Sequence, residues 1–149
     1  MASALEVAHY FLSVQTPESD ITNLKLQKLC AYAQALSLSL LDTPLFEEEL
    51  EAWTHGPVIP EIYYEYEKYG RRPIPSTGLS ERCARMPFSD EQKYVLETVG
   101  SYYGQYSAWA LRALLYSAST SPRVTTASTQ HGLCGSARIA ISQATSAVK

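Results

Sequence analysis

The sequence predicts a mainly α-helical fold, a compact domain of about five helices with one minor short β-strand or hairpin element. Apolar residues recur at helical spacing in several segments, and two of these segments begin with a capping box. One charged segment between them alternates partly between apolar and polar residues and ends at a glycine-proline pair. A chain of 149 residues is long enough for one domain with a real hydrophobic core.

Two helices are expected in the first third of the chain. Ser3 and Glu6 form an S-x-x-E capping box, which introduces a helix over about residues 4–15. Thr22 is the capping residue of the next helix, in which leucine and alanine recur at steps of three and four as far as Leu40. This second helix is expected to be the central helix of the core.

A short edge strand is predicted over about residues 46–54, where apolar residues alternate partly with glutamates, and a helical turn is the competing interpretation. Its glutamates (47, 48, 49 and 51) suit edge protection, because charges discourage pairing between strands, or attraction of a basic partner. Gly56 and Pro57 are expected to break any regular structure at this point.

A third helix is predicted to begin at Pro60, because the amide proton that proline lacks would have no partner in a first helical turn. Its tyrosines cannot all face the same way. Tyr63 and Tyr66 are expected to pack inward and Tyr64 to lie nearer the solvent, until Gly70 ends the run.

Residues 71–88 are rich in proline and are expected to form a loop with one short strand around residues 73–75. Ser89 and Gln92 then make a second capping box, which introduces a helix as far as about residue 103. Each of these boundaries follows from local turn and cap chemistry alone.

The last part of the chain changes in composition. Ser107 begins a final helix through about Tyr116, on which Trp109 and Arg112 share a face. Residues 117–149 are rich in serine, threonine and alanine, and all 15 acidic residues of the chain precede them. Such a segment buries little apolar surface, so the tail is expected to be poorly ordered or loosely attached to a domain formed by residues 1–116.

Composition excludes several classes of protein. A net charge of -3 and a pI near 5.6 argue against a dedicated nucleic-acid binder, which needs a basic face. Three cysteines without a CxxC pair suggest reduced thiols and a cytoplasmic location. The N-terminus has no secretory signal pattern, and the most apolar stretch is interrupted by lysines and glutamines, so no membrane contact is expected.

No enzyme signature is present. The patterns of P-loops, zinc metalloproteases and serine hydrolases do not occur. His131 and Cys134 form one H-x-x-C pair, but zinc normally needs four ligands, and Cys30 lies among core positions of a helix. The chain is therefore expected to have no catalytic residue, metal or cofactor, and to act as a binding module.

Three segments together resemble the SocA-like antitoxin family, also called the Panacea domain and earlier grouped with phage-associated GepA-type proteins. They are TNLKLQKLCAYAQALSLSL, PLFEEELEAWTHGPVIPEIYYEYEKYG and YGQYSAW. The similarity runs from about Leu5 to Leu114, and its most specific parts are residues 24–29 and 51–63.

The resemblance implies a bacterial or phage protein that neutralises a toxin encoded beside it by direct protein contact. In one branch of the family the antitoxin resembles an adaptor that delivers the toxin to a Clp-type protease. A DNA-binding regulator is the third alternative, and the acidic balance counts against it.

The chain departs from the family pattern after Trp109. The family typically has an acidic residue next, and then a Thr-His pair and a Pro-Trp element, where this chain has Ala110, Tyr116 and Ser117 and no later tryptophan. A shifted reading frame from about residue 115 onward is the working hypothesis.

Six residues are candidate partner contacts: Lys25, Gln27, Lys28, Trp53, Tyr64 and Trp109. Each has a simpler interpretation, because the two lysines and the glutamine suit a solvated helix face and Trp53 suits a core anchor. Five residues are assigned to the structural motif of the domain: Gly56, Pro57, Pro60, Tyr63 and Tyr66.

Overall fold

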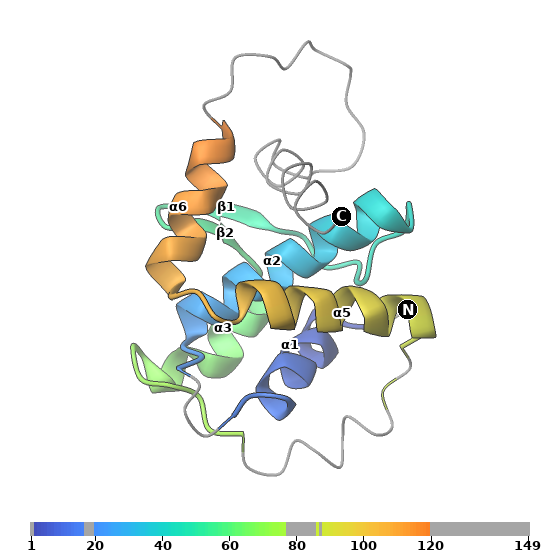
Figure 1. Ribbon diagram of the computed structural model, residues 1–149. Helices are drawn as coiled ribbons and strands as arrows, with labels where there is room; N and C mark the ends of the chain where they lie inside the picture. Colours follow the sequence, from blue (N-terminus) through green and yellow to red (C-terminus); the bar gives the residue numbers. More distant parts are fainter. Residues whose placement is uncertain (1, 17–19, 77–85, 87, 120–149) are drawn as a thin grey trace.

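The computed structural model describes residues 2–16, 20–76, 86 and 88–119 (Figure 1). Its elements in chain order are α1 (Ala4–Ser13), α2 (Asn23–Leu40), β1 (Glu51–Trp53), β2 (Gly56–Val58), α3 (Pro60–Tyr66) with a 3-10 turn (Glu67–Tyr69), α5 (Asp90–Tyr103) and α6 (Ala108–Ser119). This confirms the mainly α-helical fold with one minor strand element.

Helix α2 runs through the middle of the molecule, and α1, α3, α5, α6 and β2 all pack against it (Figure 1). It begins at Thr22, whose hydroxyl accepts the backbone N–H of Lys25 as predicted. It is buried around most of its circumference from Asn23 to Ser37, and only its last turn, including Leu40, is exposed. The prediction of a central core helix is therefore confirmed.

The helices around α2 begin as the sequence predicts. Both capping boxes are formed, with Ser3 and Glu6 at α1 and with Ser89 and Gln92 at α5. Apolar side chains at helical spacing fill the space between the helices and α2: Val7, Ala8, Phe11 and Leu12 from α1, Val95, Leu96 and Val99 from α5, and Leu111 and Leu115 from α6. Burial of each large side chain contributes about 2 kcal/mol relative to exposure.

The predicted strand over residues 46–54 is wrong in extent, because only Glu51–Trp53 form β1. Strand β1 has only the three residues Gly56–Val58 to pair with, and a side chain of α2 binds the backbone at the start of the predicted range instead. The amide oxygen of Gln34 accepts the N–H groups of Leu45 and Phe46 at 2.8 and 3.3 Å, and its amide nitrogen donates to the Phe46 carbonyl at 2.8 Å.

The expectation that Gly56 and Pro57 end all regular structure is also wrong. They begin β2, which pairs antiparallel with β1, so that Trp53 lies opposite Gly56 and Ala52 opposite Pro57. Thr54 and His55 form the turn. Gly56 has a φ of +102°, a conformation that side chains other than glycine rarely adopt.

Helix α3 starts with Pro60 at its first position, as predicted. Tyr66 is buried, Tyr63 is half-buried and Tyr64 is 64% exposed, which confirms the predicted order of burial. The short strand expected around residues 73–75 does not form; Ile74 instead donates one backbone hydrogen bond to Ile21 and accepts one from the Gln15 side chain.

Helix α6 ends at Ser119, three residues beyond the predicted end. Ser107 caps the start of this helix as predicted, since its hydroxyl accepts the N–H of Ala110 at 3.2 Å. The predictions for the tail from residue 120, including the shifted frame there, and for His131 and Cys134 lie outside the described residues, as does the third cysteine, Cys83.

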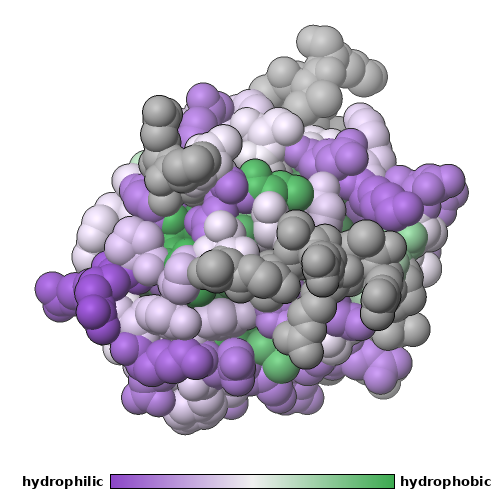
Figure 2. All heavy atoms as spheres, turned by 90° about the horizontal axis from the view of Figure 1, so that it is seen from below, coloured by the Kyte–Doolittle hydropathy of each residue, from purple (hydrophilic) through white to green (hydrophobic). Residues whose placement is uncertain are grey.

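Hydrophilic residues form most of the outline seen from below, and hydrophobic residues reach the surface there only in small areas (Figure 2). No helix in the part of the chain that the structure describes is long and apolar enough to cross a membrane.

Candidate interaction surface

Three polar side chains of α2 hold the hairpin and α3 in place. Lys28 donates to the Pro57 carbonyl at 3.2 Å, and Gln27 accepts the Ile59 N–H at 2.8 Å. Gln27 also donates to Asn23 at 3.1 Å, and Asn23 donates to the Tyr63 carbonyl at 3.1 Å. These contacts join the two segments that the sequence singled out, because the side chains come from residues 23–28 and the backbone groups from residues 57–63.

Lys28 is fully buried, with 0% of its surface exposed. Burial, and to a smaller extent the positive charge of Arg112, lowers the pKa of its ammonium group from 10.5 to about 8. Glycine is favoured at position 56 by its φ of +102°, and a Cβ atom there would lie 2.9 Å from the Lys28 Nζ, so that the ammonium group would have to shift.

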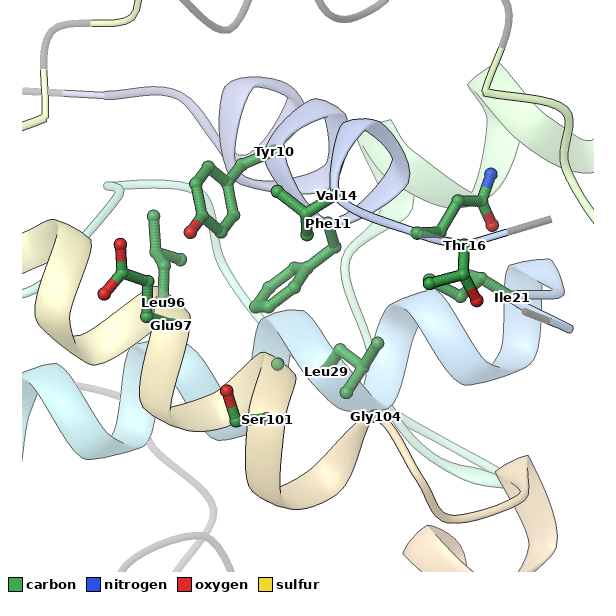
Figure 3. Close-up of a pocket in the computed structure, with 12 residues that line it drawn as sticks. Tyr10, Phe11, Val14, Thr16, Ile21, Leu29, Leu96, Glu97, Ser101 and Gly104 are labelled. Carbon is green, nitrogen blue, oxygen red and sulfur yellow. The ribbon is translucent and has the colours of Figure 1, made fainter. Parts of the chain in front are cut away.

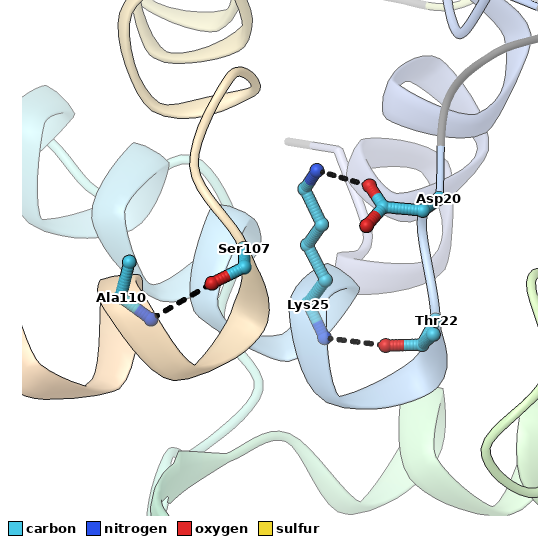
Figure 4. A network of polar contacts seen from close by, with 5 residues as sticks. All are labelled: Asp20, Thr22, Lys25, Ser107 and Ala110. Carbon is cyan, nitrogen blue, oxygen red and sulfur yellow. Dashed lines mark hydrogen bonds and ion pairs between the residues drawn. The ribbon is translucent and has the colours of Figure 1, made fainter.

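Lys25 is buried as well, with 3% of its side chain exposed, and its Nζ lies 2.8 Å from the carboxylate of Asp20 (Figure 4). The hydrogen bond from Lys25 holds the pKa of Asp20 below its usual value. The interpretation of Lys25, Gln27 and Lys28 as a solvated helix face is therefore wrong. The physical reason is that α2 is covered on all sides, so its polar groups face backbone groups and an ion-pair partner within the chain.

Aromatic rings line the hairpin and continue onto α3. The Trp53 ring lies 4.9 Å from that of Tyr63, which lies 5.5 Å from that of Tyr64. The Trp53 indole N–H donates to Glu51 at 2.7 Å. Trp53 is half-buried, so it anchors the hairpin against α3 and keeps part of its ring at the surface.

On its other side, the hairpin turn meets α6. The His55 ring lies 5.7 Å from that of Trp109, and the Arg112 guanidinium lies 5.4 Å from the centre of the Trp109 ring. Arg112 also reaches the Thr54 carbonyl at 3.5 Å. Trp109 is nevertheless 59% exposed. We call these rings and the guanidinium together the hairpin cluster, which consists of Trp53, His55, Tyr63, Tyr64, Trp109 and Arg112.

The hairpin cluster thus brings together three of the six predicted partner contacts, Trp53, Tyr64 and Trp109, from segments up to 56 positions apart. Sequence reasoning missed His55 and Arg112 as members. It also missed Asn23, although Asn23 and Gln27 lie four positions apart on the same face of a helix, which was a signal for a polar pair.

A separate groove of about 470 Å³ lies between the end of α1 and α5 (Figure 3). Tyr10, Phe11 and Val14 line it on one side, and Glu97 and Ser101 on the other. Glu97 is the only charged residue among those that line it.

The described residues give little support for a nucleophilic cysteine or for a metal site. Cys30 is buried, and burial raises the pKa of its thiol, which keeps it protonated and inert. No three His, Cys, Asp or Glu side chains among the described residues are grouped so that they could hold a metal ion.

Comparison with known families gives one match. The family model described as "Antitoxin SocA-like, Panacea domain" matches residues 26–120, which is more than half of the 149 residues. The matched range contains α2 from Leu26, the hairpin, α3, α5 and α6, so it includes all residues of the hairpin cluster. No curated protein and no solved structure matches the chain.

Proposed function

Because the chain belongs to the SocA-like antitoxin family of Panacea domains, we propose that it neutralises a toxin by binding it directly through the hairpin cluster. Family membership implies a protein partner and suggests a role without catalysis. The observation that carries the proposal is that the matched range includes an aromatic cluster with two strongly exposed rings, Tyr64 and Trp109.

The physical support comes from exposure combined with rigidity. Tryptophan, tyrosine and arginine are the residues that most often dominate the free energy of protein association. Here they are fixed by ring contacts, and the backbone beneath them is held by Lys28 and Gln27. Little conformational entropy is then lost when a partner binds, which favours affinity.

The test is co-expression with the product of the neighbouring gene. We expect the neighbour alone to stop growth, the pair to restore it, and the two proteins to co-purify. Replacing Tyr64 and Trp109 together by alanine should weaken the complex about 1,000-fold, since each anchor contributes about 2 kcal/mol and about 1.4 kcal/mol corresponds to a factor of ten.

Tyr94 provides the control, because it is 58% exposed on α5 and does not belong to the cluster. Tyr94→Ala should leave affinity within about a factor of two. A harmless neighbour, or equal effects of the control and the cluster variant, would contradict the proposal. If the level of the toxin falls only when a Clp-type protease is present, the chain neutralises the toxin by delivering it to that protease.

A further inference from the structure

The α3 side of the hairpin cluster combines exposed aromatic rings with an excess of negative charge. Residues 47–72 contain seven glutamates and three basic residues, Lys68, Arg71 and Arg72. Among the described residues none of these glutamates forms an ion pair, since the two pairs present are Lys25 with Asp20 and Lys93 with Asp90. Their negative field is therefore directed to the solvent.

The charges and the rings occupy the same surface. Glu61, Tyr64 and Glu65 are exposed and lie three and four positions apart on α3, so they are neighbours on one helix surface. Glu51 adjoins them through Trp53, which donates to its carboxylate and contacts Tyr63. We call this set the acidic aromatic surface: Glu51, Trp53, Glu61, Tyr63, Tyr64 and Glu65.

Rings and carboxylates are complementary to the same partner chemistry. A cation is attracted to the face of an aromatic ring, and its aliphatic stem packs against the ring. Two other rings of the domain already receive cations from the chain itself, since Lys68 lies 5.4 Å from the centre of the Tyr69 ring and Arg112 lies 5.4 Å from that of Trp109. An acidic partner would meet repulsion here, and a purely apolar one would leave the carboxylates without compensation.

We propose that the acidic aromatic surface docks a segment rich in lysine and arginine on the protein partner. This inference rests on the proposed function and specifies the partner's chemistry. The partner's cations lie between Glu61 and Glu65 and over the ring of Tyr64, and the exposed Trp109 adds an apolar anchor beyond the hairpin turn.

The first test removes the charge and leaves the rings. In the complex with the neighbouring gene product, Glu61→Gln with Glu65→Gln should raise the dissociation constant about tenfold or more, mainly through slower association. The loss should shrink as salt is raised from about 50 to about 300 mM, because screening removes the attraction.

The matched control is Glu91→Gln with Glu97→Gln on α5, which removes the same two charges from exposed positions. Glu61 and Glu91 both lie in the first turn of their helices, so both pairs lose the same interaction with the helix dipole. Equal weakening by the two pairs, or no weakening by the first, would overturn the inference while the proposed function stands.

The second test does not depend on the toxin. A synthetic peptide of lysine, arginine and leucine, and a matched peptide of glutamate and leucine, are titrated into the full chain while tryptophan fluorescence is recorded. The basic peptide should bind at least about tenfold more tightly, and the Glu61, Glu65 variant should lose that preference. Equal binding of both peptides overturns the inference. If the neighbouring gene product does not bind, the proposed function fails. The inference about a basic partner is then decided only by whether the chain prefers the basic peptide to the acidic one.

Discussion

Lys28 shows how a single buried residue determines local geometry. Its ammonium group is the donor to the Pro57 carbonyl and lies 2.9 Å from the position that a Cβ at residue 56 would occupy. A buried cation carries a desolvation cost, and Arg112 adds repulsion to it. The contact therefore holds the hairpin in place, but the buried charge lowers the free energy of unfolding at neutral pH.

The pH dependence of this cost can be measured. With a pKa of about 8 in the folded chain and 10.5 when unfolded, Lys28 is protonated in both states below about pH 8. Between these two pH values the unfolded chain binds more protons at Lys28 than the folded chain does. The contribution of Lys28 to the free energy of unfolding therefore rises with pH. Deprotonation of Lys28 raises the free energy of unfolding by about 3 kcal/mol at most. This gain is complete above the unfolded pKa of 10.5, and it is lost as the pH falls through about 8.

Lys28→Met removes the titrating group and keeps most of the volume. The free energy of unfolding of the original chain, minus that of the variant, should increase by up to about 3 kcal/mol from pH 7 to pH 10.5. Denaturant unfolding at several pH values measures this difference, in which the tyrosines of both chains cancel. A difference that stays constant with pH would show that Lys28 does not titrate in this range.

At the scale of elements, the hairpin and α3 depend on α2 more than on their own sequence. Each strand has three residues, which is too short to be stable alone. Gln27 binds the N–H of Ile59, the residue that precedes α3, and Asn23 binds the carbonyl of Tyr63 within it. The hairpin cluster is therefore positioned from beneath by side chains of a different element.

Gln27→Ala should cost about 2–3 kcal/mol of folding free energy, because it leaves the buried Ile59 N–H without its acceptor. Gln92→Ala is a matched control, since Gln92 likewise accepts a backbone N–H, that of Ser89 at 3.0 Å, but at an exposed helix start. Water can replace that acceptor, so we expect a cost of about 0.5–1 kcal/mol. Equal costs in denaturant unfolding would show that burial of the Gln27 contact is unimportant.

At the scale of the whole molecule, α2 is the element on which the others depend. It packs against α1, α3, α5, α6 and β2, and its Tyr32 stacks on Tyr103 at 4.2 Å and donates to the Leu111 carbonyl at 3.1 Å. Burial raises the pKa of Tyr32 and raises that of Tyr103 to about 12, so both remain neutral in this interior contact at ordinary pH. Opening α2 would require loss of all these contacts together.

Native-state hydrogen exchange tests this dependence. The central amides of α2, about residues 29–36, should exchange only through global unfolding, with a free energy of opening equal to that from denaturant unfolding. The amides of α6 should exchange through smaller openings, because the packing of α6 is mainly on α2. Protection of α6 equal to that of α2 would contradict this order.

Local signals in the sequence determined the elements and the family. The capping boxes at Ser3 and Ser89, the helical starts at Thr22 and Pro60 and the exposure of Tyr64 all depend on neighbours within four positions, which the sequence shows directly. The family assignment likewise rests on ordered segments of sequence and is confirmed by the match over residues 26–120.

The tertiary structure alone decided where the polar residues of α2 lie and which aromatic residues meet. A lysine on an apolar helix predicts solvent, and only the packing of the hairpin, α3 and α6 around α2 placed Lys28 against Pro57, 29 positions away. The pairing of His55 with Trp109 is likewise set by the packing of α6 beside the hairpin turn. Periodicity and caps act over one helical turn, whereas burial and the partners of a buried charge depend on elements brought together from distant parts of the chain.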